Sequence, residues 1–511
     1  MFEGQPKGLY ALALANTGER FGYYTMLAVF VLFLQENFQW DSGFAGTVYG
    51  AFLGLVYFLP LVGGILADKF GYGKMVTTGI TIMFVGYLLL ALPLGSGALA
   101  IAAMAGALLL IAVGTGLFKG NLQVMVGELY NNPELAGKRD SAFSLFYMAF
   151  NVFSLFAPTA ALAIMDYAQN TLGYSSADSY HFAFVVACIS LIVSISIYFA
   201  CRPMYRHVEG GAKKAAVATT DAATESISPE ETKQRIVALC LVFAVVIFFW
   251  MSFHQNGLTL TYFARDYNVT SESGVRTMLF SVWNLVAIII AVYGAFSVAQ
   301  SKTANGKLIG TGFLVAAIAW LGYQYMNTDA STTVAVSAPI FQQFNPFYVV
   351  ALTPVSLAIF GWLAKKGKEP SAPRKIALGM LVAAVGFVVI LIPSFNLLAP
   401  DAQAAAIEAG QNPARVSSDW LLYTYLVLTF AELLLSPMGI SFVSKVAPPQ
   451  YKGMMMGGWF VATAIGNFLV AIPAMIWGKT PLWVVWATLV ALCLISYVFL
   501  SSQMKKLEKV A

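Results

Sequence analysis

Residues 10–35 read YALALANTGERFGYYTMLAVFVLFLQ, an apolar stretch interrupted by one cluster of polar side chains. About 20 apolar residues cross a bilayer as a helix, so the stretch predicts a membrane span. Asn16, Glu19, Arg20, Tyr23 and Tyr24 recur at helical spacing and therefore share one helix face. Ionisable groups at membrane depth are costly, so this face must meet protein or water, and it indicates a functional site.

The composition of the whole chain agrees with a membrane environment. Of its 511 residues 59% are hydrophobic and only 10% carry charge, against about 25% in an ordinary soluble domain. This leaves too little charge to cover the surface of a soluble fold of this length. The net charge is +5 without a long basic block, which argues against nucleic acid as a partner.

Fourteen segments are long and apolar enough to predict transmembrane helices. They cover residues 10–35, 44–67, 74–94, 98–125, 140–165, 180–201, 236–263, 276–299, 307–325, 345–364, 375–397, 418–443, 452–477 and 481–502. Their apolar runs are continuous rather than alternating, which disfavours membrane-spanning strands. We expect an all-α integral membrane protein.

The basic residues indicate the orientation. With both termini in the cytoplasm, 23 of the 29 Lys and Arg residues fall in cytoplasmic segments and 4 in outer loops, while Arg20 and Lys119 lie inside spans. Cytoplasmic loops of membrane proteins carry such an excess, so the count supports fourteen spans with both ends inside.

A polar segment divides the spans into two groups. Residues 207–234 are rich in Ala, Thr, Ser, Gly and Glu and predict a flexible cytoplasmic linker between residues 1–206 and 235–511. Both parts contain G-x-L-A-x-K followed by Gly, beginning at Gly64 and Gly361. If residues 276–325 form an inserted helical hairpin, these echoes fall at equivalent places in two six-helix bundles. Internal repeats are typical of transporters, although chance similarity remains an alternative for each echo.

The remaining deep ionisable residues are few. Lys119 lies in the fourth span, His254 in the seventh and Glu432 in the twelfth. Arg20 and Lys119 suit a carboxylate and Glu432 suits an ammonium, so the pattern predicts a receptor for a zwitterion. The alternatives are a structural ion pair of Glu19 with Lys119 or Arg20, and a core role for His254.

Other polar and aromatic residues of the spans complete the predicted site. They are Tyr57, Gln123, Tyr147, Asn151, Asn256, Asn345, Ser436, Trp459 and Thr463. Tyr and Trp side chains also pack cores and form interface belts, which is the alternative for each of them.

Five motifs in order resemble those of the proton-dependent oligopeptide transporter family of the major facilitator superfamily. They are Glu19-Arg-Phe-Gly-Tyr23-Tyr24, the loop Gly64 to Lys74, Gly116-Leu-Phe-Lys119-x-Asn121, Phe146-Tyr147-Met-x-x-Asn151 and Glu432-Leu-x-x-Ser436-Pro437-x-Gly439-x-Ser441. The resemblance spans residues 15 to 475. It implies the major facilitator fold, with two six-helix bundles and an inserted hairpin.

The resemblance also implies roles for individual residues. Arg20, Tyr23, Tyr24, Tyr57, Lys119 and Asn151 would bind the carboxylate side and backbone of a peptide, Asn345 and Glu432 its amino end, and Trp459 would line the pocket. Glu19 and Lys119 would couple protonation to movement. Gly64, Asp68 and Gly71 would belong to the conformational loop. Asn16, Leu27 and His254 depart from the family pattern. We therefore expect Glu19 and His254 to share the binding and release of the coupling proton.

These observations predict a secondary transporter that imports di- and tripeptides by proton symport and alternating access. The alternative is a transporter of another amphoteric or anionic solute, with absent or altered proton coupling. An enzyme is not expected, because the chain contains neither H-E-x-x-H nor G-x-S-x-G. Protons are the expected coupling ion, with no cofactor or metal. We expect a monomer in contact with lipid in a bacterial inner membrane.

Overall fold

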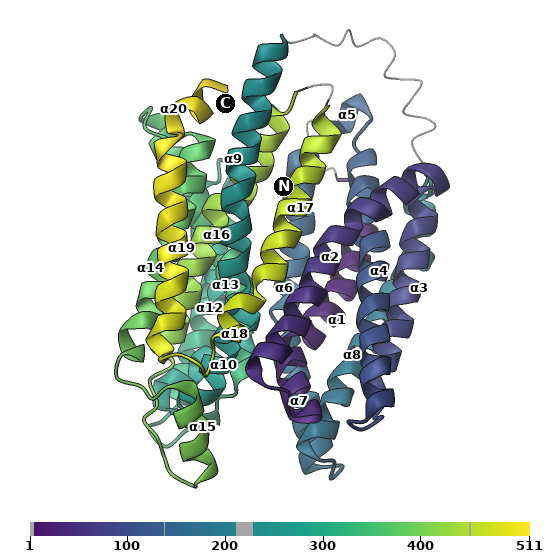
Figure 1. The fold of residues 1–511 in the computed structure, drawn as a ribbon. Helices are drawn as coiled ribbons and strands as arrows, with labels where there is room; N and C mark the ends of the chain where they lie inside the picture. The colour runs from purple at the N-terminus through teal and green to yellow at the C-terminus, as the bar shows by residue number, and fades with distance from the viewer. Residues whose placement is uncertain (1–4, 137, 211–227, 449–450, 511) are drawn as a thin grey trace.

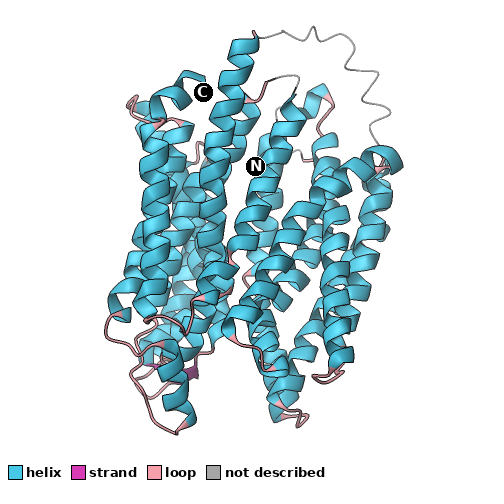
Figure 2. Cartoon of the chain, in the orientation of Figure 1, coloured by secondary structure: helices cyan, strands magenta, loops and turns pink. Residues whose placement is uncertain are grey.

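The computed structural model describes residues 5–136, 138–210, 228–448 and 451–510, and almost all of them are helical (Figures 1 and 2). In this part of the chain thirteen segments are long and apolar enough to cross a membrane. Helix α1 (Lys7–Phe38), which carries Glu19 and Arg20, is of similar length and brings the set to the fourteen predicted spans. The expected all-α membrane fold is therefore confirmed.

The first bundle contains the N-terminal spans. Its elements are α1, α2 (Ser42–Phe70), α3 (Tyr72–Ala91), α4 (Ala98–Glu128), α5 (Pro133–Ala136), α6 (Arg139–Ser154), α7 (Ala157–Asn170), α8 (Ser176–Ala200), η1 (Arg202–Met204) and η2 (Arg206–Val208). Helix α4 packs between α2 and α3, and α1 packs on α8. Helices α6 and α7 form one span that is broken just before Pro158, because proline cannot supply an amide to the preceding turn.

The second bundle contains the C-terminal spans. Its elements are α9 (Pro229–Phe253), η4 (His254–Gly257), α10 (Thr259–Tyr267), α13 (Phe344–Lys365), α14 (Ala372–Ser394), α15 (Pro400–Glu408), α16 (Asp419–Val446), α17 (Lys452–Leu469), α18 (Ala471–Met475), α19 (Leu482–Ser502) and α20 (Met504–Val510). Helix α14 packs against α16 and α19. The span from α9 to α10 is interrupted by the 3₁₀ turn η4, which begins at His254.

The inserted hairpin differs in detail from its predicted bounds. It consists of β1 (Ser271–Ser273), η5 (Gly274–Phe280), α11 (Val282–Gln300), α12 (Ala304–Met326), β2 (Thr333–Ala335) and η6 (Ala338–Gln343). The first helix begins at Val282 rather than near residue 276, because residues 274–280 wind as a 3₁₀-helix. Strands β1 and β2 pair antiparallel and close the base of the hairpin, a feature that the sequence did not predict.

The predicted linker at 207–234 is shorter in the structure. Residues 211–227 lie outside the described residues, and α9 already begins at Pro229. Ser228 caps this helix by accepting a hydrogen bond from the backbone amide of Glu231 at 3.2 Å. A Ser cap followed by Pro and two Glu residues favours a helix start, so the last six residues of the predicted linker are helical.

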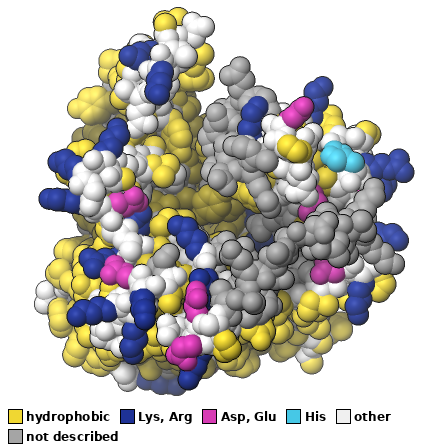
Figure 3. Space-filling view, turned by 90° about the horizontal axis from the view of Figure 1, so that it is seen from above, with side chains coloured by type: hydrophobic (Ala, Val, Ile, Leu, Met, Phe, Trp, Pro, Cys, Tyr) yellow, Lys and Arg dark blue, Asp and Glu magenta, His cyan; other side chains and the backbone are white. Residues whose placement is uncertain are grey.

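The two ends of the molecule differ. We call the end that carries α5 and α20 the linker end (Figure 1). Figure 3 looks onto this end and shows a hollow between groups of helices, with hydrophobic side chains in its depth and Lys and Arg side chains around it. At the opposite end, hydrogen bonds join the bundles: Arg265 Nη1 to Gln35 Oε1 at 2.6 Å, Tyr262 Oη to Ser42 O at 3.0 Å, and Gln342 Nε2 to Ala28 O at 3.1 Å. The structure is thus open toward the linker end and closed at the other.

Close helix packing in the first bundle depends on glycine, and it generates a stability prediction. A Cβ at Gly114 of α4 would lie 2.5 Å from the Gly79 carbonyl oxygen of α3, whereas a Cβ at Gly106 would meet nothing within 4 Å. Gly114→Leu should therefore lower the free energy of unfolding by about 1–3 kcal/mol or more, and Gly106→Leu, the control on the same helix, should not. Thermal unfolding of both purified variants measures this, and equal midpoints would contradict the packing argument.

Candidate functional site

The polar face of α1 contains a buried ion pair between neighbouring residues. The Arg20 guanidinium donates from Nε and Nη2 to the two carboxylate oxygens of Glu19, each at 2.5 Å. The Glu19 side chain is fully buried and that of Arg20 is 4% exposed. The Arg20 guanidinium also lies 4.5 Å from the centre of the Tyr23 ring. The partner of Glu19 is therefore Arg20 rather than Lys119, which were the two alternatives from the sequence.

Lys119 of α4 lies near this pair but has no carboxylate of its own among the described ion pairs. Its ammonium lies 4.6 Å from the centre of the Tyr57 ring on α2, a cation–π contact. The Tyr57 ring also lies near His254 of the second bundle, with ring centres 5.7 Å apart. Tyr57 thus connects Lys119 with the predicted proton-coupling histidine.

Glu432 of α16 occupies the opposite wall. Its carboxylate accepts a hydrogen bond from Asn345 Nδ2 at 3.1 Å, and the same amide nitrogen is 3.2 Å from Thr429 Oγ1. In the described part of the chain Glu432 has no cationic partner. Tyr24, Tyr57 and Tyr147, all from the first bundle, lie within electrostatic range of this carboxylate. The structure thereby brings the two predicted halves of the site together.

Several other predicted residues surround this centre without forming a direct contact with its charges. Asn151 is buried and donates to the Tyr147 carbonyl oxygen at 2.9 Å, and Tyr147 itself is 43% exposed. Asn256 lies in η4, where its carbonyl oxygen accepts from the Tyr425 hydroxyl at 2.8 Å. Gln123 on α4 and Ser436 on α16 are half-buried. Pro437 follows Ser436 inside a continuous helix.

Two residues of α17 are engaged in packing rather than presented to the hollow. Trp459 is 3% exposed, and its indole lies directly over Gly439 of α16, where there is no room for a Cβ. Thr463 is equally buried and donates to the Trp459 carbonyl oxygen at 2.9 Å. In this conformation Trp459 packs against α16, whereas the described hydrogen bond of Thr463 stays within α17.

The predicted conformational loop joins α2 and α3 at the linker end. Gly71 has φ = 97°, a conformation that favours glycine, and its amide donates to the Ala67 carbonyl oxygen. Asp68 accepts a hydrogen bond from the Tyr72 hydroxyl at 3.0 Å. A Cβ at Gly64 would meet nothing within 4 Å, so its lack of a side chain is not required by packing here.

Sequence reasoning missed a set of buried polar groups beside His254. In the described structure the Nδ1 of His254, the Nε1 of Trp250 and both side-chain polar atoms of Asn467 are buried without a hydrogen-bond partner. The Trp250 and His254 rings stack with centres 5.2 Å apart, and Asn467 lies next to the imidazole. Buried polar groups normally have partners, often an ordered water. The only sequence signal was the position of Asn467 before Pro473, which echoes that of Asn151 before Pro158.

The centre can therefore bind opposite charges at two places. At the centre, the first bundle contributes Glu19, Arg20 and Lys119, which leaves one positive charge, and the second contributes Glu432, which has no ion-pair partner among the described residues. Aromatic rings stand between them. In such a water-poor environment unpaired charges attract a complementary ligand strongly. The arrangement suits a small solute that carries both an ammonium and a carboxylate.

Known proteins resemble this chain over most of its length. It is 28% identical to "Uncharacterized transporter YclF" of Bacillus subtilis, in an alignment that covers 94% of this chain and 90% of the relative. It is also 28% identical to "Peptide transporter YePEPT" of Yersinia enterocolitica, over 92% and 88% of the two chains. The crystal structure of a POT family transporter in complex with 5-aminolevulinic acid superimposes with a TM-score of 0.73 at 18% identity, over 99% and 98%.

A family model described as "POT family" matches residues 74–224 and 314–482, which together are more than half of the chain. The match includes Lys119, Asn151, Asn345 and Glu432, four of the residues that form the two walls of the site. The chain belongs to the POT family.

Proposed function

We propose that this protein imports di- and tripeptides by proton symport through alternating access. The observation that carries the proposal is the separation of charge across the centre. Among the described ion pairs, Lys119 on the first-bundle side of the centre has no anionic partner and Glu432 on the second-bundle side has no cationic one. A relative in Yersinia is named a peptide transporter, and others in Salmonella and Lactococcus carry di- and tripeptide transport in their names.

In this proposal the peptide is held by its two ends. Its carboxylate would approach Lys119 and compete with Glu19 for Arg20, whose planar guanidinium can form two parallel hydrogen bonds. Its ammonium would pair with Glu432, which Asn345 already orients at 3.1 Å. Tyr23, Tyr24 and Tyr57 would contact the backbone between the ends. Because charges at the ends supply most of the recognition, varied side chains are tolerated.

Proton coupling would act through the same charges. Protonating Glu19 or Glu432 removes one partner of a pair and changes the relative stability of the two conformations. His254 changes charge near neutral pH in its free form, and it contacts Tyr57, which in turn contacts Lys119. The coupling ion is the proton, and the route requires no cofactor.

The bundles would rock about this centre, and the present structure would correspond to the inward-open state. We place the linker end in the cytoplasm of a bacterial inner membrane, with both termini inside. The basic excess of the segments at this end supports the assignment. The binding charges all come from one chain, so we propose that the transporting unit is a monomer surrounded by lipid.

A second candidate is transport of another amphoteric solute with weaker proton coupling. It is favoured by the departures at Asn16, Leu27 and His254, because the family pattern has acidic residues or Arg at those positions. Uptake of labelled dialanine into proteoliposomes, with and without a pH gradient and against competing solutes, distinguishes the two. Peptides should compete fully if the first proposal is correct.

The end-charge model predicts that single neutral substitutions abolish concentrative uptake. Glu432→Gln and Lys119→Ala should each reduce gradient-driven dialanine accumulation at least about 100-fold, because each leaves one charged end of the bound peptide buried without a partner. The controls are Glu408→Gln and Lys302→Ala, exposed residues of matched type away from the centre. Normal accumulation by both site variants would refute the assignment.

The coupling model predicts that His254→Gln abolishes proton-driven accumulation of peptide but not peptide binding and exchange. Glutamine can still form hydrogen bonds, but unlike histidine it does not take up a proton near neutral pH. Counterflow exchange of dialanine should therefore persist, while the response of uptake to an inward pH gradient is lost. His207→Gln, an exposed histidine at the linker end, is the control. Full pH-driven uptake by His254→Gln would remove this residue from the mechanism.

The hydrogen bonds between the bundles at the closed end predict that mutations there shift the balance from the inward-open toward the outward-open conformation. Combining Gln342→Ala with Arg265→Ala removes two hydrogen bonds between the bundles, each contributing about 1 kcal/mol, so the outward-open population should rise about tenfold or more. Thiol labelling of Ala28→Cys, a 1% exposed position at that contact, measures the change. As a control, Lys479→Ala should leave the labelling rate of the Ala28→Cys protein unchanged. An unchanged labelling rate in the double variant would show that these two hydrogen bonds do not hold the end closed.

A further inference from the structure

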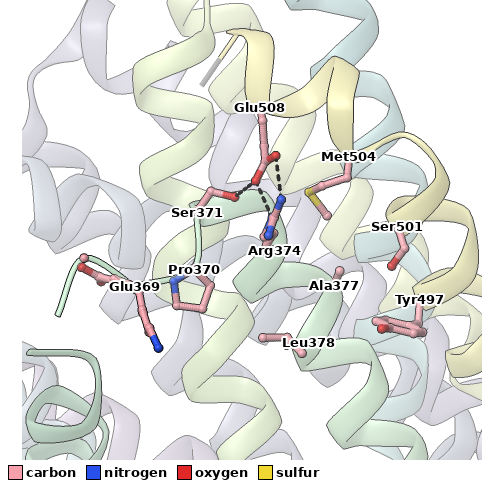
Figure 4. Close-up of a pocket in the computed structure, with 12 residues that line it drawn as sticks. Glu369, Pro370, Ser371, Arg374, Ala377, Leu378, Tyr497, Ser501, Met504 and Glu508 are labelled. Carbon is pink, nitrogen blue, oxygen red and sulfur yellow. Dashed lines mark hydrogen bonds and ion pairs between the residues drawn. The ribbon is translucent and has the colours of Figure 1, made fainter. Parts of the chain in front are cut away.

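A cavity of about 640 Å³ lies away from the transport site, at the linker end of the second bundle. It is an open pocket bordered by the loop between α13 and α14, by α14 and α19, and by the terminal helix α20 (Figure 4). Its lining includes polar side chains, among them Lys368, Ser371 and Ser501, and apolar side chains, among them Leu378 and Met504. A mixed polar and apolar lining suits an amphiphilic ligand.

One wall of the cavity is fixed by an ion pair between α14 and α20. The Arg374 Nε donates to Glu508 Oε1 at 2.6 Å and Nη2 to Oε2 at 3.1 Å, while the Ser371 hydroxyl donates to Glu508 Oε1 at 2.7 Å (Figure 4). Hydrogen bonds from Arg374 and Ser371 hold the pKa of Glu508 below its usual range. The carboxylate therefore stays charged at cytoplasmic pH and keeps α20 against α14.

The segments around the cavity carry a large excess of positive charge. Residues 365–375 and 504–510 contain eight Lys or Arg residues and two acids. Both acids are engaged, Glu508 by Arg374 and Glu369 by Lys375 at 2.5 Å. The other six cations are Lys365, Lys366, Lys368, Lys505, Lys506 and Lys509, and none has an ion-pair partner among the described residues. Six unmatched charges attract an anion.

Neighbouring side chains place the cavity at the level of the membrane surface. Trp362 is 56% exposed and its ring lies 3.7 Å from the Lys366 ammonium, as expected for an aromatic residue at the boundary between lipid and water. On α19, just before its end at Ser502, Val498 is 63% exposed and Phe499 is 40% exposed. A ligand with its polar part in the cavity would find apolar surface directly below.

We propose that this cavity binds the phosphate headgroup of an anionic phospholipid from the cytoplasmic leaflet. Lys368 in the lining contacts the phosphate, and Lys505 and Lys506, on the helix that borders the pocket, add positive potential. The acyl chains lie along the exposed apolar side chains of α19. Basic clusters next to membrane spans attract anionic lipid. The second bundle is thereby anchored to the leaflet at the end that opens and closes.

The test compares lipids on the purified full-length protein in detergent. Phosphatidylglycerol should raise the thermal unfolding midpoint by about 2 °C or more over phosphatidylcholine at equal concentration. The triple variant Lys368→Gln, Lys505→Gln, Lys506→Gln should lose most of this difference. A control with Lys233→Gln, Lys302→Gln, Lys307→Gln removes the same charge from exposed positions elsewhere and should keep it.

Three outcomes would overturn the proposal. Equal midpoints of the parental protein in both lipids would show that the headgroup is not recognised. If both triple variants lost the midpoint difference between the two lipids equally, the effect would come from the overall surface charge rather than from this pocket. A matching rise with about 10 mM inorganic phosphate alone would show a site for a soluble anion rather than for a lipid.

Discussion

The ion pair of Glu19 with Arg20 determines what the rest of the site can do. Inside a membrane protein each charge must find a partner, because the surroundings solvate ions poorly. By taking both oxygens of Glu19, Arg20 leaves Lys119 without a carboxylate. In the described structure the partner of the Glu432 carboxylate is the neutral amide of Asn345. Under the proposed function, these two charges are the places at which a solute with opposite charges at its ends would bind.

Broken helices position these groups. The seventh span is interrupted at His254 and the fifth just before Pro158. A break frees backbone carbonyl and amide groups that lipid could not satisfy, so breaks are tolerated only where protein or water meets the chain. At the first break the Asn256 carbonyl oxygen finds the Tyr425 hydroxyl. At the break in the seventh span a freed carbonyl group thus meets protein rather than lipid, and both interruptions give the spans places to bend.

The spans were predictable because hydropathy is a local property. Each of the fourteen overlaps its predicted range, although some ends differ by several residues, as at Pro229 and Val282. The charged site residues were predictable for a related reason, since ionisable groups in apolar helices stand out. Their partners were not. These partners depend on distances between helices. Such distances decide whether Glu19 pairs with Arg20 or with Lys119, and whether Trp459 faces the solute or packs over Gly439. The unpartnered group around Asn467 and the pairing of β1 with β2 are also products of tertiary contact.

The two short strands at the base of the inserted hairpin have a consequence for how this chain could have arisen. Ser271 is paired with Ala335, so the chain leaves and re-enters the bundle at neighbouring points. Helices α11 and α12 pack mainly on each other, with α13 as their principal contact in the bundle. A segment whose ends already meet can be gained, lengthened or lost without moving the helices on either side. The hairpin is thus a self-contained insertion, whose two ends lie next to each other at the base where it joins the bundle.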